Sequence, residues 1–166
     1  LLKIKTPSEL QRLRLENLRE REEAITNDEL RHMLKIVGGY FLHPGKERPG
    51  IPHPAGYTCH LNGYTDFPQI LCMPNIAEIL AFVMTRMVKK EDSGPISWVI
   101  GPEKASFSLA LFMAKFLGAR YGVVEKDENG RLASWERFTV YPGERVLVIN
   151  DVMSSIQGST LETMEI

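Results

Sequence analysis

The hydrophobic pattern in the second half of the chain alternates between helical and strand periods. Apolar side chains recur at helical spacing over residues 75–89 and 107–117, and Gly118 ends the second pattern. Three short apolar runs rich in β-branched residues lie at 96–100, 121–125 and 146–149. A continuous apolar run bounded by turn residues is typical of a strand buried on both faces. Because strands and helices alternate, we predict right-handed crossovers and an α/β fold, a Rossmann-like parallel sheet flanked by helices.

The helix predicted over 75–89 has one continuous apolar face. We assign this face to the core and give its methionines no role beyond packing. It consists of Ile76, Ile79, Leu80, Val83, Met84 and Met87.

Two further helices are predicted near the N-terminus. The sequence Thr6-Pro7-Ser8-Glu9 is a capping box with proline at the first helical position, and the helix it starts is expected to run to about Glu23. Its leucines form only a thin stripe, so most of this helix is expected to face solvent. A second helix starts at Thr26–Glu29 and ends at Gly38-Gly39.

Residues 40–74 differ from the rest of the chain because prolines and glycines are frequent there and exclude a long helix. A short strand is expected at 57–61. The segment is either a long surface connection or, as is common for long loops in compact domains, a functional one. We divide the chain into 1–74, with the N-terminal helices and this segment, and 75–166, the α/β core, within one compact domain.

Composition narrows the class of protein. The chain has 166 residues and a net charge of −1, which gives no indication of a nucleic-acid partner. No apolar stretch reaches the roughly 18–20 residues that span a bilayer, and the first twenty residues are too charged for a signal peptide. Cys59 and Cys72 have no metal-binding spacing, so free thiols in a reducing, cytoplasmic setting are the simplest interpretation.

A polar turn follows the last predicted strand. Asn150 and Asp151 come directly after it, at the strand end where open α/β sheets bind ligands. A loop of small residues comes next and leads into a predicted helix, whose N-terminal amides attract phosphate. The turn therefore offers a carboxylate for sugar hydroxyls and a cradle for phosphate, although an ordinary strand–turn–helix unit is the alternative. The cradle residues are Ser154, Ser155, Gln157, Gly158, Ser159 and Thr160.

This stretch, VLVI-ND-VM-SSIQGST, resembles the phosphoribosyl-diphosphate (PRPP) motif of type I phosphoribosyltransferases. That motif has four apolar residues, two acids, two variable residues and a Thr/Ser-Gly loop. Asn150 stands where the motif has its first acid, and the loop is one residue longer than usual. The resemblance implies that Asp151 and Asn150 contact the ribose and that the loop binds the 5′-phosphate of PRPP.

Two other loops resemble parts of the same family. The sequence GPEKAS at 101–106 is similar to the pyrophosphate loop, with Ser106 in place of a usual glycine, which implies pyrophosphate contacts by Glu103, Lys104, Ala105 and Ser106. Ordinary exposed charge is the alternative for Glu103 and Lys104. Lys126 aligns with a catalytic cation of a mobile loop, whereas solvated charge is the better interpretation of Arg131 and Arg137.

The order Tyr40-Phe41-Leu42-His43-Pro44-Gly45-Lys46 is similar to the hood of orotate phosphoribosyltransferases, which covers the base. Tyr40, Phe41 and Lys46 are its candidate base-side residues. Tyr64-Thr65-Asp66 corresponds loosely to the aromatic–apolar–Asp sequence that follows in the family.

The resemblance implies displacement at the anomeric carbon of PRPP by a nucleobase, orotate or another pyrimidine, with release of pyrophosphate. Mg²⁺ is expected to bind mainly through substrate oxygens, without an all-protein cage. Because Asn150 brings no charge, turnover is expected to be lower than with two acids. Family members continue beyond the phosphate loop and commonly form dimers, so we expect a fragment or an unusually completed sheet, and a homodimer.

Two alternatives stay open. One is a PRPP- or nucleotide-binding regulatory domain with weak or no catalysis, which Asn150, the longer loop and Ser106 favour. The other is a generic nucleotide binder, against which stands the absence of GxGxxG and GxxxxGK sequences.

Overall fold

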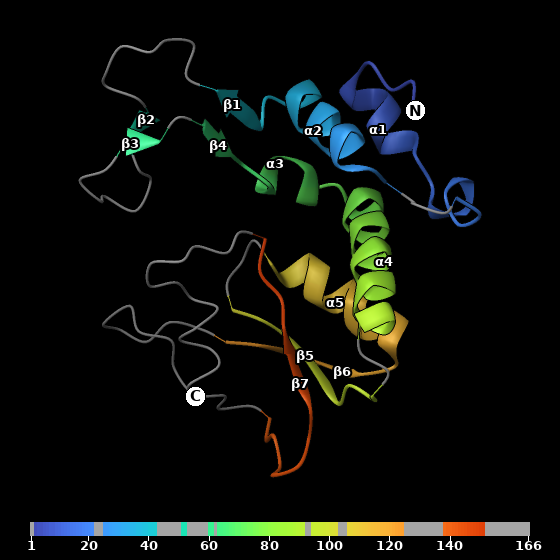
Figure 1. Ribbon diagram of the computed structural model, residues 1–166, viewed down its shortest axis with the longest axis vertical. Helices are drawn as coiled ribbons and strands as arrows, with labels where there is room; N and C mark the ends of the chain where they lie inside the picture. The colour runs from blue at the N-terminus through green and yellow to red at the C-terminus, as the bar shows by residue number, and fades with distance from the viewer. Residues whose placement is uncertain are drawn as a thin grey trace.

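The computed structural model describes residues 2–21, 25–42, 51–52, 60–61, 63–91, 94–102, 106–124 and 138–151 (Figure 1). Within these ranges the chain forms short N-terminal helices, two antiparallel strand pairs and a three-stranded parallel sheet flanked by helices. The α/β fold expected from the hydrophobic pattern is confirmed. No helix in the described ranges combines the length and the apolar character needed to cross a membrane.

The first helix is shorter than predicted. α1 spans Pro7–Arg12 behind the expected Thr6–Glu9 capping box, Leu13 is extended, and a 3₁₀ turn, η1, covers Leu15–Asn17. Expecting one helix to about Glu23 was therefore wrong. Leu15 lies five positions after Leu10, about 140° around a continuous helix, so one straight helix cannot bury both. The break allows both leucines, and Leu18, to enter the core.

The second helix follows its sequence signals. α2 spans Asn27–Ile36, and Thr26 and Glu29 form the capping box at its start. Gly38 then takes φ +71°, a left-handed conformation that few other residues adopt without strain.

The proline-rich segment forms two short antiparallel ladders. β1, Tyr40–Leu42, pairs with β4, Gly63–Thr65, and β2, Ile51–Pro52, pairs with β3, His60–Leu61. The expected strand at 57–61 is therefore present at its last two residues, while 57–59 lie outside the described ranges. The one-turn helix α3, Pro68–Leu71, follows β4.

Helix α4, Pro74–Glu91, occupies the predicted position and buries Ile76, Ile79 and Leu80. Assigning Met87 to the core was wrong, because its side chain is 62% exposed. The core covers only part of the apolar stripe at the C-terminal end of this helix.

The sheet contains β5, Trp98–Gly101, β6, Arg120–Val123, and β7, Val146–Val148, in the order β6-β5-β7, and both pairings are parallel. Helix α5, Phe107–Leu117, connects β5 to β6 and ends at Gly118 with φ +66°. All of β5 is buried, as expected of a central strand. β7 was predicted to be buried on both faces, which is wrong: Val146 is 37% exposed, because β5 is the one strand paired with β7 among the described residues.

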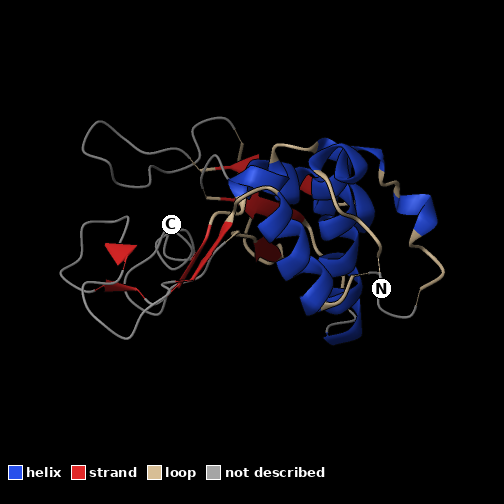
Figure 2. Cartoon of the chain, turned by 90° about the horizontal axis from the view of Figure 1, so that it is seen from above, coloured by secondary structure: helices blue, strands red, loops and turns tan. Residues whose placement is uncertain are grey.

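Helices cover one face of the sheet. α5 packs on β5 and β6, and α4 packs on α5 (Figure 1), so that Figure 2 shows the helices gathered on one side. The main core runs from Leu10 in α1 to Ile149 after β7. On the opposite face a smaller cluster joins Trp98, Ile100 and Val124 to Phe138 and Val140. The N-terminal helices and the sheet thus share one hydrophobic core.

Candidate functional site

The carboxyl ends of the three parallel strands lie at one edge of the sheet. β6 and β7 flank β5 on opposite sides, so the chain reverses its direction of winding at β5. In open α/β sheets the crevice at such a switch point is the usual ligand site. The residues that leave β5 and β7 at this edge are Gly101, Pro102, Asn150 and Asp151.

Asn150 and Asp151 occupy the predicted position at the end of β7. The amide of Ile149 donates to the carbonyl of Ile100 over 2.8 Å, which extends the ladder by one residue and buries Ile149. The side-chain oxygen of Asn150 accepts a hydrogen bond of 2.9 Å from the backbone amide of Asp151. Asp151 itself is partly exposed. Asp151 is therefore not among the residues buried in the core.

The β1–β4 ladder brings two aromatic rings together. Phe41 is paired with Tyr64, and their ring centroids are 6.4 Å apart at 25°. Burial raises the pKa of Tyr64, and the negative charges of Asp66 and Asp151 raise this pKa further. Asp66, just after β4, and Asp151, just after β7, thus act on the same phenol, although 85 residues separate them in the sequence.

Ser106, the end of the predicted pyrophosphate loop, is fully buried at the start of α5. A Cβ atom added to Gly101 would stand 2.8 Å from the Ser106 hydroxyl oxygen and 3.2 Å from Cβ of Ala110. Strand and helix therefore approach each other closely here, and Gly101 is required because no side chain fits. The Ser106 side chain lies inside this junction.

Several predicted site residues lie outside the described ranges: Glu103, Lys104, Ala105, Lys126, Lys46, and the phosphate-loop residues Ser154, Ser155, Gln157, Gly158, Ser159 and Thr160. The same holds for Arg131 and Arg137. Their roles stay predictions. Of the hood residues, Tyr40 is half-buried with the Lys35 ammonium 5.4 Å from its ring centroid, and Phe41 is exposed.

Tyr64 was not among the candidate site residues selected from the sequence. Its local signal, an aromatic residue two positions before Asp66, is weak on its own. Its position depends on the pairing of Tyr40–Leu42 with Gly63–Thr65. The segment that connects these strands is too long for its sequence to indicate the pairing register.

Among the residues that the structure describes, no three His, Cys, Asp or Glu side chains gather in a way that could hold a metal ion. The oxygen donors at the sheet edge, Asn150 and Asp151, are of the type that Mg²⁺ prefers. They are too few for a cage.

Curated proteins similar in sequence to this chain carry the name orotate phosphoribosyltransferase. The protein from Pelotomaculum thermopropionicum is 34% identical over 106 residues, 64% of this chain and 53% of that protein. The protein from Thermus thermophilus is 33% identical over 120 residues, 72% of this chain and 57% of that protein. The protein from Thermotoga maritima is 29% identical over 107 residues, 64% and 54% of the two chains.

The chain spans about half the length of the curated relatives it matches. No protein-family model matches it. The resemblance to phosphoribosyltransferases inferred from the motif after β7, and to the orotate branch inferred from residues 40–46, is nevertheless confirmed by these relatives.

Proposed function

We propose that this protein transfers the 5-phosphoribosyl group between PRPP and a nucleobase, with orotate or another pyrimidine as the base, and with release of pyrophosphate. The observation that carries the proposal is the position of Asp151, which follows β7 at the switch point of the sheet and is partly exposed. The names of the curated relatives supply the substrate class.

In this proposal Asp151 accepts hydrogen bonds from the ribose hydroxyls. Loss of pyrophosphate gives the anomeric carbon oxocarbenium character, as in glycoside cleavage, so a nearby negative charge stabilises the transition state. No strong protein nucleophile is needed, because the base nitrogen attacks and the protein aligns the partners.

The paired rings of Phe41 and Tyr64 are suited to the base. Aromatic faces stack on flat heterocycles and keep water from the reacting carbon. Phe41 is 47% exposed, so its ring is accessible to a ligand at the sheet edge.

The remaining roles follow from the resemblance. Residues 154–160 bind the 5′-phosphate, the loop at 103–105 holds the pyrophosphate, and Lys126 supplies positive charge to the leaving group. Ser106 is fully buried, so its side chain is given no pyrophosphate contact. Mg²⁺ would supply positive charge to the diphosphate and would be held mainly through substrate oxygens rather than by a cage of protein side chains. We also propose a cytoplasmic homodimer.

A PRPP-binding domain with weak catalysis is the second candidate. The observation that favours it is the hydrogen bond between the Asn150 side-chain oxygen and the Asp151 amide, since this acceptor is engaged with the backbone and carries no charge. Asn150→Asp keeps an acceptor for that amide and adds the missing charge. Turnover should therefore rise in this variant if the second carboxylate is what limits the reaction.

A two-stage experiment tests the proposal. Thermal unfolding with PRPP and Mg²⁺ measures binding, because a ligand that binds only the folded state raises Tm. Pyrophosphate release with orotate, uracil or no base then measures transfer. Asp151→Asn should lower release by about 10²–10³-fold, while Asp28→Asn, on the exposed face of α2, should leave it unchanged. Release that is equal in Asp151→Asn and in the unchanged protein would overturn the proposal; stabilisation by PRPP without base-dependent release would favour the second candidate.

A further inference from the structure

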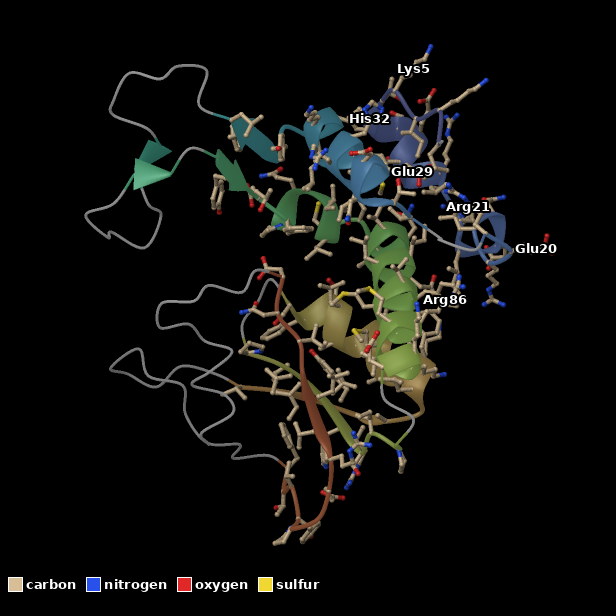
Figure 3. The ribbon with its side chains drawn as sticks, in the orientation of Figure 1. Lys5, Glu20, Arg21, Glu29, His32 and Arg86 are labelled. Carbon is tan, nitrogen blue, oxygen red and sulfur yellow. The ribbon has the colours of Figure 1, made fainter. Side chains whose placement is uncertain are left out.

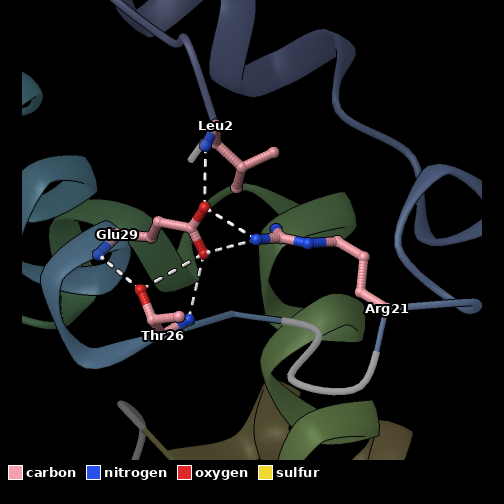
Figure 4. Close-up of polar contacts among 4 residues, drawn as sticks. All are labelled: Leu2, Arg21, Thr26 and Glu29. Carbon is pink, nitrogen blue, oxygen red and sulfur yellow. Dashed lines mark hydrogen bonds and ion pairs between the residues drawn. The ribbon is translucent and has the colours of Figure 1, made fainter.

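Glu29 is the only charged side chain that is buried in the described part of the chain, with 2% of its surface exposed. Its carboxylate accepts hydrogen bonds from the Leu2 amide at 2.7 Å, from Arg21 Nη2 at 2.9 Å and from the Thr26 amide at 3.0 Å (Figure 4). Arg21 Nη2 also reaches the second carboxylate oxygen, at 3.2 Å, and the Thr26 hydroxyl donates to that oxygen at 3.3 Å. One carboxylate thus joins the start of the chain, the segment before α2 and α2 itself.

The surroundings of Glu29 favour the ionised form of its carboxyl group. Burial, the largest single influence, raises the pKa, but the hydrogen bonds from Arg21, Thr26 and Leu2 and the positive charge of Arg21 together lower it to about 2. A buried carboxylate with this many donors is strongly held in place.

The Glu29 cluster is attached to the helix that packs on the α/β core. Arg86 of α4 donates to the carbonyl of Arg21 over 3.0 Å. At the second residue of α4, the Asn75 side-chain amide donates to the carbonyls of Leu10 and Leu13 over 2.8 and 2.9 Å. In Figure 3, Glu29 lies near the start of α4, Arg21 lies beside it, and Arg86 lies further along α4. Side-chain donors of α4 therefore hold the end of α1 and the backbone at Arg21, and Glu29 joins Arg21 to α2.

The other end of α2 meets the β1–β4 ladder. The Gly39 amide donates to the carbonyl of Leu34 over 2.8 Å, and the Gly39 carbonyl accepts from the Asp66 amide over 2.8 Å. A Cβ atom at Gly39 would stand 2.7 Å from the Asp66 carbonyl oxygen. There is no space for the end of α2 to move without displacing the ladder.

The two strands of the β1–β4 ladder are connected to different elements of the protein. β4 continues into α3, which packs on α4 and whose Leu71 carbonyl accepts a bond from Ser108 of α5 at 3.5 Å. β1 is joined to α2 through Gly38 and Gly39, and its Tyr40 packs on the main core. The orientation of Phe41 and Tyr64 above the sheet edge thus depends on α2 at one of its two ends.

We propose that Arg21 and Glu29 are a positioning pair for the nucleobase side of the site: by fixing α2 they hold the β1–β4 ladder, with Phe41 and Tyr64, above Asp151. This inference rests on the proposed function and adds residues to it that contact no substrate. Loss of the pair lets the β1 side of the ladder shift, which weakens base binding more than it slows the chemical step.

The test compares Glu29→Gln with Asp28→Asn. Asp28 lies on the same helix and pairs with Arg31 over 2.8 Å on an exposed surface, so it is a matched control that leaves the buried cluster intact. The first readout is the titration of Tyr64, followed by NMR of ¹³C-labelled tyrosine and assigned with Tyr64→Phe. Asp151→Asn calibrates it, because removal of that charge should lower the pKa of Tyr64.

We expect Glu29→Gln to shift the pKa of Tyr64 towards its ordinary value as the ladder moves away from Asp151, and Asp28→Asn to leave it unchanged. In steady-state assays of Glu29→Gln, KM for the base should rise about tenfold, while kcat should change less than about threefold. This pattern is expected when a variant loses binding energy that the ground state and the transition state share. If Glu29→Gln does not fold, Gly39→Ala tests the same connection, because its Cβ pushes on Asp66.

Two results separate the proposals. A folded Glu29→Gln or Gly39→Ala protein with unchanged Tyr64 titration would overturn the positioning role. Absence of base-dependent pyrophosphate release from the unchanged protein would instead remove the proposed function, and the Tyr64 titration would still decide whether the pair positions the ladder.

Discussion

The N-terminal helical region and the α/β region each join three stretches of chain through one glutamate. Glu29 is buried and accepts from Leu2, Arg21 and Thr26. Glu144, whose side chain is 20% exposed, accepts from the Trp98 indole and the Tyr141 amide, both at 2.9 Å, and from Arg120. The two clusters use the same chemistry in different surroundings.

The difference follows from what else holds each region. α1, η1 and α2 have only six, three and ten residues, lengths at which helices are marginal in isolation. The strands at Glu144 are already held by parallel ladders, by α5 and by the stacking of Trp98 on Phe138 at 4.9 Å. We therefore expect the buried cluster to contribute strongly to stability and the exposed one to contribute little.

Glu29→Ala is the substitution expected to have the largest effect on stability, and it tests the comparison between the two clusters most directly. Its removal leaves the Leu2 and Thr26 amides and the Arg21 guanidinium without their acceptor, which should lower the free energy of unfolding by about 3 kcal/mol. Urea denaturation followed by circular dichroism measures the change. A loss no larger than that of Asp28→Ala would show that burial of Glu29 adds nothing.

Lowering the pH should remove the contribution of the ionised Glu29 side chain to the free energy of unfolding. The pKa of Glu29 is about 2 in the folded chain against 4.5 for the free side chain. The carboxylate therefore stabilises the fold above about pH 4.5, and this stabilisation, about 3 kcal/mol, is lost as pH falls towards 2. Denaturation between pH 6 and 2 should show a steeper loss in the unchanged protein than in Glu29→Gln; parallel curves would contradict the assignment.

Gly122→Ala tests the apolar side of the comparison. A Cβ atom at Gly122 would stand 2.5 Å from Cζ of Phe138, the ring that stacks on Trp98. We expect a loss of about 1–2 kcal/mol from overpacking and a change in tryptophan fluorescence. Gly143→Ala, at a turn with φ +91° and open space around it, is a control that strains the backbone without touching this cluster. Unchanged fluorescence in Gly122→Ala would mean that Phe138 does not cover the strand.

Glu144→Gln should give the smallest effect. The Tyr141 amide, with the Trp98 and Arg120 side chains, lowers the pKa of Glu144 despite the opposing effect of desolvation. The Glu144 carboxylate is in contact with solvent, so salt screens its interactions. The side-chain amide of glutamine in the variant replaces most of its hydrogen bonds. Denaturation at low and high salt should barely separate the variant from the unchanged protein. A loss comparable to that of Glu29→Gln would remove the contrast between the two regions.

Local signals in the sequence were sufficient for much of the fold. The capping boxes at Thr6 and Thr26, the glycines at 38 and 118 and the apolar face of α4 depend on neighbours in the chain, and the structure has helix boundaries where they predict them. The strand before Asn150-Asp151 was likewise identified from its own residues. Errors arose where burial depends on distant partners, as for Met87 and Val146.

The sequence by itself determined the alternation of strands and helices and the carboxylate at the end of β7, because both are encoded by residues close together in the chain. Only the tertiary structure decided that Tyr64 pairs with Phe41 across the β1–β4 ladder and that Glu29 is buried with hydrogen bonds from Leu2 and Arg21. The strand register and helix packing behind these contacts are set by the burial of apolar surface between segments far apart in the sequence. The local pattern of residues does not show which distant segments will pack together.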